Sequence, residues 1–295
     1  MRRLVFTLLA ALALGCGGSR SSENTAPSAP STVLPGSSGD TFTVMTFNIQ
    51  HGLNGDGAYD LKWAVAAIAA RNPDLVGLQE LTRNHPSYKC EDQAPRMAEA
   101  LSAATGRQWH YVYHQEWTTT VFDCHGDGPA TEGIGFLAPA PIGEDASVPL
   151  WNGRLGVKTT LRARTPVSVI VTHLASGKLP ADFNDRSRQL GTLLPWTSSQ
   201  GSPRLLICDC NFSPEAPEYQ QLRALYRDAW ADAVAAGTAK GRMDGITHKA
   251  SRIDYVFYEA NPALELVSVE NVDTRALIGT EASDHRPQVA TFRIR

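Results

Sequence analysis

The sequence lacks the features that mark several large classes of protein. Its conspicuous apolar run, Leu4 to Leu14, has eleven residues, whereas a helix that spans a bilayer needs about 20. No Gly-x-Ser-x-Gly elbow is present, which excludes the serine hydrolases built on that turn. Nor is there a Gly-x4-Gly-Lys-Ser/Thr loop or a His-Glu-x-x-His pair, which excludes P-loop nucleotide hydrolases and zincin proteases.

Basic residues are also scarce. The chain has 27 Lys and Arg against 30 Asp and Glu, a net charge of −3 at pH 7. No long basic run offsets this balance, although tight, sequence-independent nucleic-acid binders usually carry a basic stripe. Nucleic acid therefore stays open as a substrate but is not indicated by the charge.

The beginning of the chain has the pattern of an export signal. Two arginines precede Leu4–Leu14 and a Gly-Cys pair follows it, which is the order of a signal peptide. The pair resembles the lipobox of bacterial lipoproteins and predicts a lipid anchor at Cys16, although Ala13 stands where leucine is usual and ordinary cleavage stays open. We expect a signal peptide with a lipobox-like end at 1–16, and a cell-envelope lipoprotein, periplasmic or on the outer surface, or a secreted protein.

Composition divides the rest of the chain into a tether and one domain. Residues 17–40 are rich in Gly, Ser, Pro and Thr and have almost nothing to bury, as in a flexible linker. Residues 41–295 are long enough to bury one sizeable core. We expect a monomer, and nothing in the sequence indicates a protein partner.

Strand and helix patterns interleave through both halves of residues 41–295. Thr41–Ile49 is β-branched and aromatic with polar alternation, and Asp60 then precedes apolar residues at helical spacing. Some strand segments alternate apolar and polar residues, while others are apolar almost throughout, which suits two sheets packed face to face. The predicted fold class is α/β, a two-sheet β-sandwich with helices on both outer faces, in four layers.

Four cysteines fall within the predicted domain. Cys90 and Cys124 could pair in an oxidising compartment, but two free thiols stay open as the alternative. Cys208 and Cys210 stand in the strand-like segment LLICDCNF, where a bridge would close a very tight loop and the partners of a zinc site are missing. We expect these two residues to be buried and unbridged.

Polar residues that could bind a metal ion or a phosphate follow the predicted strands at or just beyond their ends. In an extended chain, residues two apart project to the same face, so Asp209 and Asn211 should point together. Arg186, Arg188 and Gln189 are expected only to decorate a helix surface. The strand-end residues are Asn48, Glu80, His173, Asp209, Asn211, Asp254, Asp284 and His285.

Seven short motifs follow one another along the predicted domain: MTFNIQHG, DLVGLQE, GIGFLAP, VTHLASG, ICDCNFSP, SRIDYVF and SDHRPQVA. In this order they resemble the endonuclease/exonuclease/phosphatase superfamily of metal-dependent phosphoesterases. The resemblance covers about Thr41 to Arg295. It departs from the family at Cys208-Asp209-Cys210-Asn211, where relatives commonly have Gly-Asp-Phe-Asn.

The resemblance implies a hydrolase that uses Mg²⁺ or Mn²⁺ to cleave a phosphoester, foremost a phosphodiester, by direct attack of water. A nuclease, a phospholipase-like or sphingomyelinase-like enzyme and a phosphodiesterase for small substrates stay open. The competing class is a non-catalytic surface lipoprotein that uses the fold as a binding module. In the enzyme, Glu80 would be the principal metal ligand, helped by Asn48 and Asp284, since hard divalent cations prefer oxygen donors.

Five residues take catalytic roles by the same resemblance. Asp209 would position and deprotonate the attacking water beside Asn211, which would also donate to a phosphate oxygen. His285 would be protonated, oriented by Asp254, and would hold the phosphate through its positive charge. His173 would donate from the other side of the phosphate.

Overall fold

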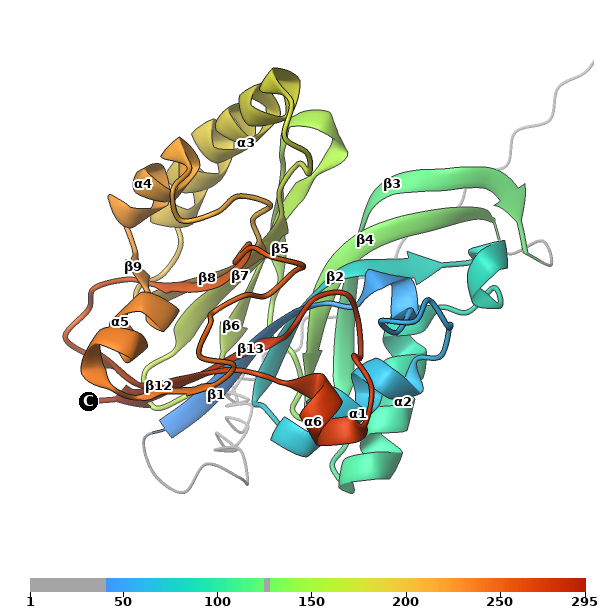
Figure 1. The fold of residues 1–295 in the computed structure, drawn as a ribbon, viewed down its shortest axis with the longest axis horizontal. Helices are drawn as coiled ribbons and strands as arrows, with labels where there is room; N and C mark the ends of the chain where they lie inside the picture. Colours follow the sequence, from blue (N-terminus) through green and yellow to red (C-terminus); the bar gives the residue numbers. More distant parts are fainter. Residues whose placement is uncertain (1–40, 125–127) are drawn as a thin grey trace, which may run out of the picture. The chain divides into compact units, whose positions relative to one another are not determined.

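The structure, a computed structural model, describes residues 41–124 and 128–295, and two mixed β-sheets pack face to face in it (Figure 1). The seven-stranded sheet has the order β10-β12-β13-β1-β2-β4-β3, and the six-stranded sheet has the order β5-β6-β7-β8-β11-β9. The signal peptide, the tether and the anchor predicted within 1–40 lie outside the described residues. None of the helices described is both long and apolar enough to cross a membrane.

The strands of each sheet come from both halves of the chain. The first sheet contains β1 (Thr41–Asn48), β2 (Leu75–Arg83), β3 (His110–Asp123), β4 (Pro129–Ala138), β10 (Ala239–Gly241), β12 (Leu264–Asn271) and β13 (Gln288–Ile294). The second contains β5 (Ala146–Pro149), β6 (Leu155–Leu161), β7 (Val167–His173), β8 (Arg204–Asp209), β9 (Arg227–Asp228) and β11 (Asp254–Tyr258).

Helices cover the outer faces of both sheets, which confirms the predicted four-layer fold class (Figure 1). The first sheet is covered by α1 (Lys62–Arg71), α2 (Gln93–Thr105) and α6 (Thr274–Ile278), and the second by α3 (Pro180–Ser198) and α4 (Pro217–Arg223). A further helix, α5 (Ala229–Ala236), packs against the core between the sheets. The sequence did not predict α5 and α6, nor the short strands β5, β9 and β10.

The alternation of side chains along the strands explains why polar residues gather at one edge. In β8, Leu205 and Ile207 point into the core between the sheets, while Leu206 and Cys208 point into the core beneath α3 and α4. Because the period of a strand is two, Asp209 continues the inner series beyond the apolar core. The residues that continue the inner series of β1, β7 and β11 in the same way are Asn48, His173 and Asp254.

Two disulfides are present in the described part of the chain. One joins Cys90, which follows the 3-10 helix η2 (Pro86–Tyr88), to Cys124 just after β3, with Cα atoms 5.6 Å apart. Of the two alternatives that the sequence left open, a disulfide or two free thiols, the structure shows the disulfide. The bridge ties the segment after β2 to the long hairpin of β3 and β4.

The second disulfide joins Cys208 to Cys210, so the prediction that these residues are unbridged was wrong. That prediction assumed a strand that stays extended through both cysteines, in which their Cα atoms would lie about 6.6 Å apart at 3.3 Å per residue. Instead β8 ends at Asp209, and the Cα atoms are 5.1 Å apart. The two side chains project from the same face and this bend brings them within bonding reach.

Replacing Cys90 and Cys124 together by Ala should lower the free energy of unfolding by about 4 kcal/mol, because the bridge closes a loop across 34 positions of the unfolded chain. Urea denaturation of the variant and the wild type measures the difference. Wild-type protein unfolded in excess dithiothreitol, which opens both disulfides, is the control and should be no more stable than the variant. An unchanged unfolding midpoint would show that the two cysteines are not bridged in the folded protein.

Candidate active site

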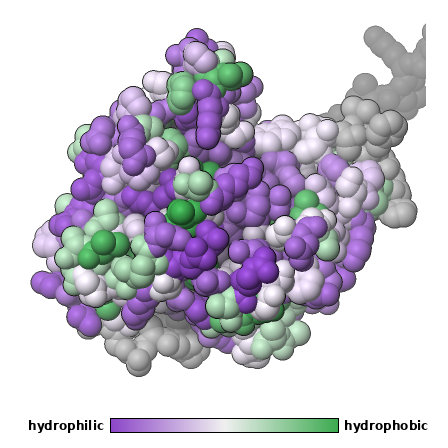
Figure 2. All heavy atoms as spheres, viewed as in Figure 1, coloured by the Kyte–Doolittle hydropathy of each residue, from purple (hydrophilic) through white to green (hydrophobic). Residues whose placement is uncertain are grey.

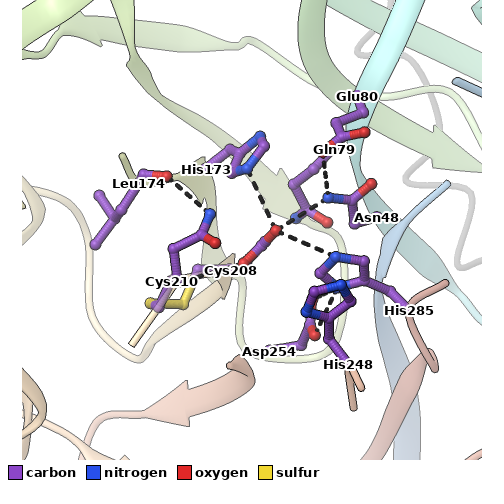
Figure 3. Close-up of polar contacts among 12 residues, drawn as sticks. Asn48, Gln79, Glu80, His173, Leu174, Cys208, Cys210, His248, Asp254 and His285 are labelled. Carbon is purple, nitrogen blue, oxygen red and sulfur yellow. Dashed lines mark hydrogen bonds and ion pairs between the residues drawn. A yellow bond between two sulfur atoms is a disulfide. The ribbon is translucent and has the colours of Figure 1, made fainter. Parts of the chain in front are cut away.

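One oxygen of the buried Asp209 carboxylate forms the centre of the site. Asp209 is 1% exposed, and its Oδ2 atom lies 3.0 Å from Asn48 Nδ2, 3.3 Å from His173 Nε2 and 3.8 Å from His285 Nε2 (Figure 3). Burial opposes ionisation, but the two facing histidines and the Asn48 hydrogen bond hold the pKa of Asp209 well below its usual value. The carboxylate is therefore ionised at neutral pH.

His285 is a buried cation held between two carboxylates. Its Nδ1 atom lies 2.9 Å from Asp254 Oδ2, and its Nε2 atom faces Asp209. Burial disfavours the charged imidazole, but Asp254 and Asp209 outweigh this effect and raise the pKa of His285 to about 10. Both ring nitrogens thus carry protons at neutral pH, and the structure places the predicted Asp254–His285 pair in direct contact.

His173 is held as a neutral donor. Its Nδ1 atom lies 2.8 Å from Arg154 Nη1, and a guanidinium can only donate, so Nδ1 accepts. The remaining proton must then reside on Nε2, which points at Asp209. The charge of Arg154 is balanced by Glu116, whose side chain is fully buried and lies 3.2 Å away. The two histidines therefore differ in charge although both face the same oxygen.

Glu80 reaches the site because β2 is irregular there. The pairing of β2 with β4 shifts register between Leu78 and Leu81, and Glu80 has a φ of 57°. A bulge of this kind redirects a side chain relative to the regular pleat. Glu80 Oε1 accepts a hydrogen bond of 2.8 Å from Asn48 Nδ2, which brings these two predicted metal ligands together.

The surroundings of Glu80 fit a hard divalent cation. No Lys or Arg among the residues described pairs with Glu80, and its ionic partner is the imidazole of His51 at 3.3 Å. Burial and the nearby Glu80 raise the pKa of Glu132, which also contacts His51. The buried Oε1 atoms of Gln50 and Gln79 accept no hydrogen bond from the described residues. Excess negative charge and unused oxygen acceptors together suit an ion with bound waters.

Asp284, the third predicted metal ligand, lies on another side of the site. It groups with His248 and His285, whereas Glu80 groups with His173 and Asp209. His248 Nε2 is 3.3 Å from Asp284 Oδ2, and its ring stacks on His285 with centroids 4.4 Å apart (Figure 3). The role of Asp284 as a metal ligand stays a prediction.

Asn211 is hydrogen-bonded both to Asp209 and to the end of β7, and the prediction that its amide projects together with the Asp209 carboxylate stays a prediction. Its φ is 54°, so the chain has left the extended conformation on which the same-face argument depended. The Asn211 side chain donates to the Leu174 carbonyl oxygen at 3.0 Å, and its backbone N–H donates to Asp209 Oδ1 at 3.1 Å. Asn211 thus joins β8 to the end of β7, and its contact with phosphate stays a prediction.

Five residues near the site were missed in the sequence. Two of them had a usable signal, because His51 and His248 stand within a few positions of the motif residues Asn48 and Asp254. The other three have no signal of their own, since their contacts arise from the pairing of distant strands. These are Glu116, Glu132 and Arg154.

Comparisons with known proteins identify the family of the chain and solved structures with a similar fold. The model of the Endonuclease/Exonuclease/phosphatase family matches residues 45–285. No curated protein matches the chain at a significant level. An endonuclease/exonuclease/phosphatase from Beutenbergia cavernae is similar in structure, with 24% identity and a TM-score of 0.67 over 86% of this chain and 72% of its own.

Two further solved structures share the fold at lower identity. The catalytic domain of human nocturnin with bound sulfate has 20% identity and a TM-score of 0.65, over 87% of this chain and 94% of its own. ANGEL2, described as a 2′,3′-cyclic phosphatase in complex with adenosine-2′,3′-vanadate, has 17% identity and a TM-score of 0.59, over 86% of this chain and 96% of its own.

The segment after His173 is fixed from behind by α3, contrary to the prediction of a decorative helix surface. Arg186 is 1% exposed, pairs with Glu218 at 3.0 Å and donates to the carbonyl oxygens of Ala175 and Gly177. Gln189 is also buried and accepts from the backbone N–H of Ala175. Arg188, in contrast, is exposed as predicted.

Arg186→Met should lower the free energy of unfolding by about 3–5 kcal/mol, because it leaves the buried Glu218 carboxylate without its partner. Arg188→Met on the same helix is the matched control and should change stability by less than about 1 kcal/mol, since an exposed cation contributes little. Urea denaturation monitored by circular dichroism gives both values. Equal effects of the two substitutions would contradict the structural role assigned to Arg186.

Proposed function

The chain belongs to the endonuclease/exonuclease/phosphatase family, and from this membership we propose that it hydrolyses a phosphoester, foremost a phosphodiester, by direct attack of water with the help of a divalent cation. The observation that carries the proposal is the Asp209 oxygen that faces both His173 and His285. One general base, one cation and one neutral donor converge there, each with a chemical use at a phosphorus centre.

The two histidines suit the two ends of the reaction. His285 carries a positive charge that does not depend on solvent pH near neutrality, so it can hold a phosphoryl oxygen and stabilise the charge that develops on it. His173 offers a proton on Nε2 while Arg154 fixes its tautomer from behind. It can therefore donate a hydrogen bond to the leaving oxygen without adding a second cation.

Asp209 would orient the attacking water and accept its proton. Without substrate, the low pKa of Asp209 makes it a weak base, because a general base is most effective when its pKa lies near the working pH. A phosphate bound to His285 and His173 would compete for the two donors that lower this pKa. Substrate binding would thus raise the basicity of Asp209 at the moment when water attacks the phosphorus.

Glu80 and Asn48 would hold the cation, Mg²⁺ or Mn²⁺, with Asp284 as the further predicted ligand. When bound, such an ion neutralises charge on phosphoryl oxygens. Glu80 contributes the charge that retains it, and His51 and Asn48 fix the direction of the Glu80 carboxylate.

A small or soluble phosphodiester fits this chain better than a bilayer substrate. The face drawn in Figure 2 is largely hydrophilic, with apolar side chains in small, separated patches. Nocturnin binds a sulfate and ANGEL2 an adenosine-2′,3′-vanadate, and both anions are compatible with a site built for a phosphate group. The net negative charge of the chain does not favour tight binding of long nucleic acids.

We also propose that the enzyme acts outside the cytoplasm, anchored through Cys16. Two disulfides in the described part of the chain support an oxidising compartment. Mass spectrometry of the mature N-terminus should find a lipid-modified cysteine at position 16 as the first residue. An unmodified N-terminus at another position would contradict the anchor.

Purified residues 41–295 should hydrolyse bis(p-nitrophenyl) phosphate with Mg²⁺ or Mn²⁺ and lose the activity in EDTA. Asp209→Ala and His285→Ala should each lower kcat/KM by about 10² to 10⁴, because a general base or a fixed charge is lost. The exposed Asp56→Ala and the partly exposed His110→Ala are matched controls and should stay within about twofold of the wild type. Activity that survives chelation would contradict the mechanism.

Glu80→Gln should raise the concentration of Mg²⁺ needed for half-maximal activity by about tenfold or more, because it removes the charge that holds the cation. The measurement is a Mg²⁺ titration of the aryl diesterase rate after treatment with chelator. Glu99→Gln, on the exposed face of α2, is the control and should leave the titration unchanged. Unaltered Mg²⁺ dependence in Glu80→Gln would remove Glu80 from the ligand set.

A further inference from the structure

The disulfide between Cys208 and Cys210 spans a single residue, the central Asp209. Both cysteines are fully buried, and their sulfur atoms lie on the side of the strand that faces away from Glu80 and His285 (Figure 3). They belong to the core beneath α3 and α4, which also contains Leu174, Phe212 and Tyr255. The bridge thus encloses the backbone of Asp209, the central residue of the site.

This bridge cannot serve stability in the way that Cys90–Cys124 does. The entropy that a disulfide removes from the unfolded chain grows with the length of the loop it closes. The two bridges close loops with sequence separations of 2 and 34. The short bridge therefore restricts few unfolded conformations, and its main consequence must be local.

The local backbone is where the bridge has its effect. The strand ends at Asp209 and the chain turns at once, since Asn211 adopts a φ of 54°. The Asp209 carbonyl accepts from Leu174 N–H at 3.0 Å on one side, and the Cys210 N–H donates to the Ile253 carbonyl at 2.8 Å on the other. The disulfide holds the Cα atoms of the two residues that flank Asp209 5.1 Å apart. The bend at the end of β8, which lies between β7 and β11, is therefore fixed by a covalent bond.

We propose that the Cys208–Cys210 disulfide is a positioning element that fixes the Asp209 carboxylate toward Asn48, His173 and His285. This inference rests on the proposed phosphodiesterase function. Without the bridge, the flanking residues can return toward the extended spacing of about 6.6 Å, which rotates Asp209 relative to its three partners. A misplacement of about 1 Å at a reacting group can lower a rate by about 10².

The test compares two bridge-free enzymes, in which either Cys208 and Cys210 or Cys90 and Cys124 are both replaced by Ala. Steady-state kinetics on bis(p-nitrophenyl) phosphate at saturating Mg²⁺ and thermal unfolding are measured for each. Loss of the short bridge should lower kcat by about 10- to 100-fold with KM changed by less than about threefold. Loss of the long bridge should lower the unfolding temperature more and leave kcat within about twofold.

A positioning role also predicts that the effects of the bridge and of Asp209 are coupled. Removing the bridge from the Asp209→Ala enzyme should cause little further loss of residual kcat, because the group that the bridge positions is already absent. Independent, multiplicative losses in this double-mutant cycle would overturn the inference. So would an unchanged kcat in the folded variant that lacks only the short bridge.

If the variant with Ala at both Cys208 and Cys210 fails to fold, the same question can be answered by reducing the wild-type enzyme. Dithiothreitol is oxidised to its cyclic disulfide as two protein thiols form, and alkylation followed by peptide mass spectrometry shows which bridge has opened. The fall in kcat should follow opening of Cys208–Cys210 and not that of Cys90–Cys124. A kcat independent of the short bridge would overturn the inference, while a wild type inactive on the diester would instead overturn the proposed function.

Discussion

Burial of the Asp209 carboxylate at the rim of the inter-sheet core is the constraint on which the site depends. A buried charge is costly unless hydrogen bonds and opposite charge compensate it. Here Asn48, His173 and His285 supply this compensation, and Asp254 in turn balances His285. The same contacts that make the burial tolerable also bring a carboxylate, a cationic imidazole and a hydrogen-bond donor together at one point.

The two sheets contribute to this arrangement in different ways. β7, β8 and β11 of the second sheet supply His173, Asp209 and Asp254, while β1 and the bulged β2 of the first supply Asn48 and Glu80. His285 precedes β13 and reaches across to Asp254. The site therefore requires not only that each sheet forms but also that the two pack in the correct register against each other.

The sequence predicted the parts of this design that depend on regular geometry. Alternation along the strands gave the two-sheet fold class, and the ordered motifs led to the residues that the structure gathers around Asp209. Prediction failed where the chain departs from regularity, as at the bend that pairs Cys208 with Cys210. Nor did it foresee the positive φ of Asn211 and the hydrogen bond from its side chain to Leu174. It also missed Arg154 and misjudged Arg186, because their partners come from distant segments and no local pattern marks a buried arginine.

The contacts of Asn48 have a consequence for the newly made protein. Its amide donates to Asp209 across 161 positions of the sequence, and its carbonyl accepts from Ser283 across 235. A growing chain that has emerged only in part cannot close these contacts. The site around Asp209 would thus stay incomplete during synthesis until the last strands arrive.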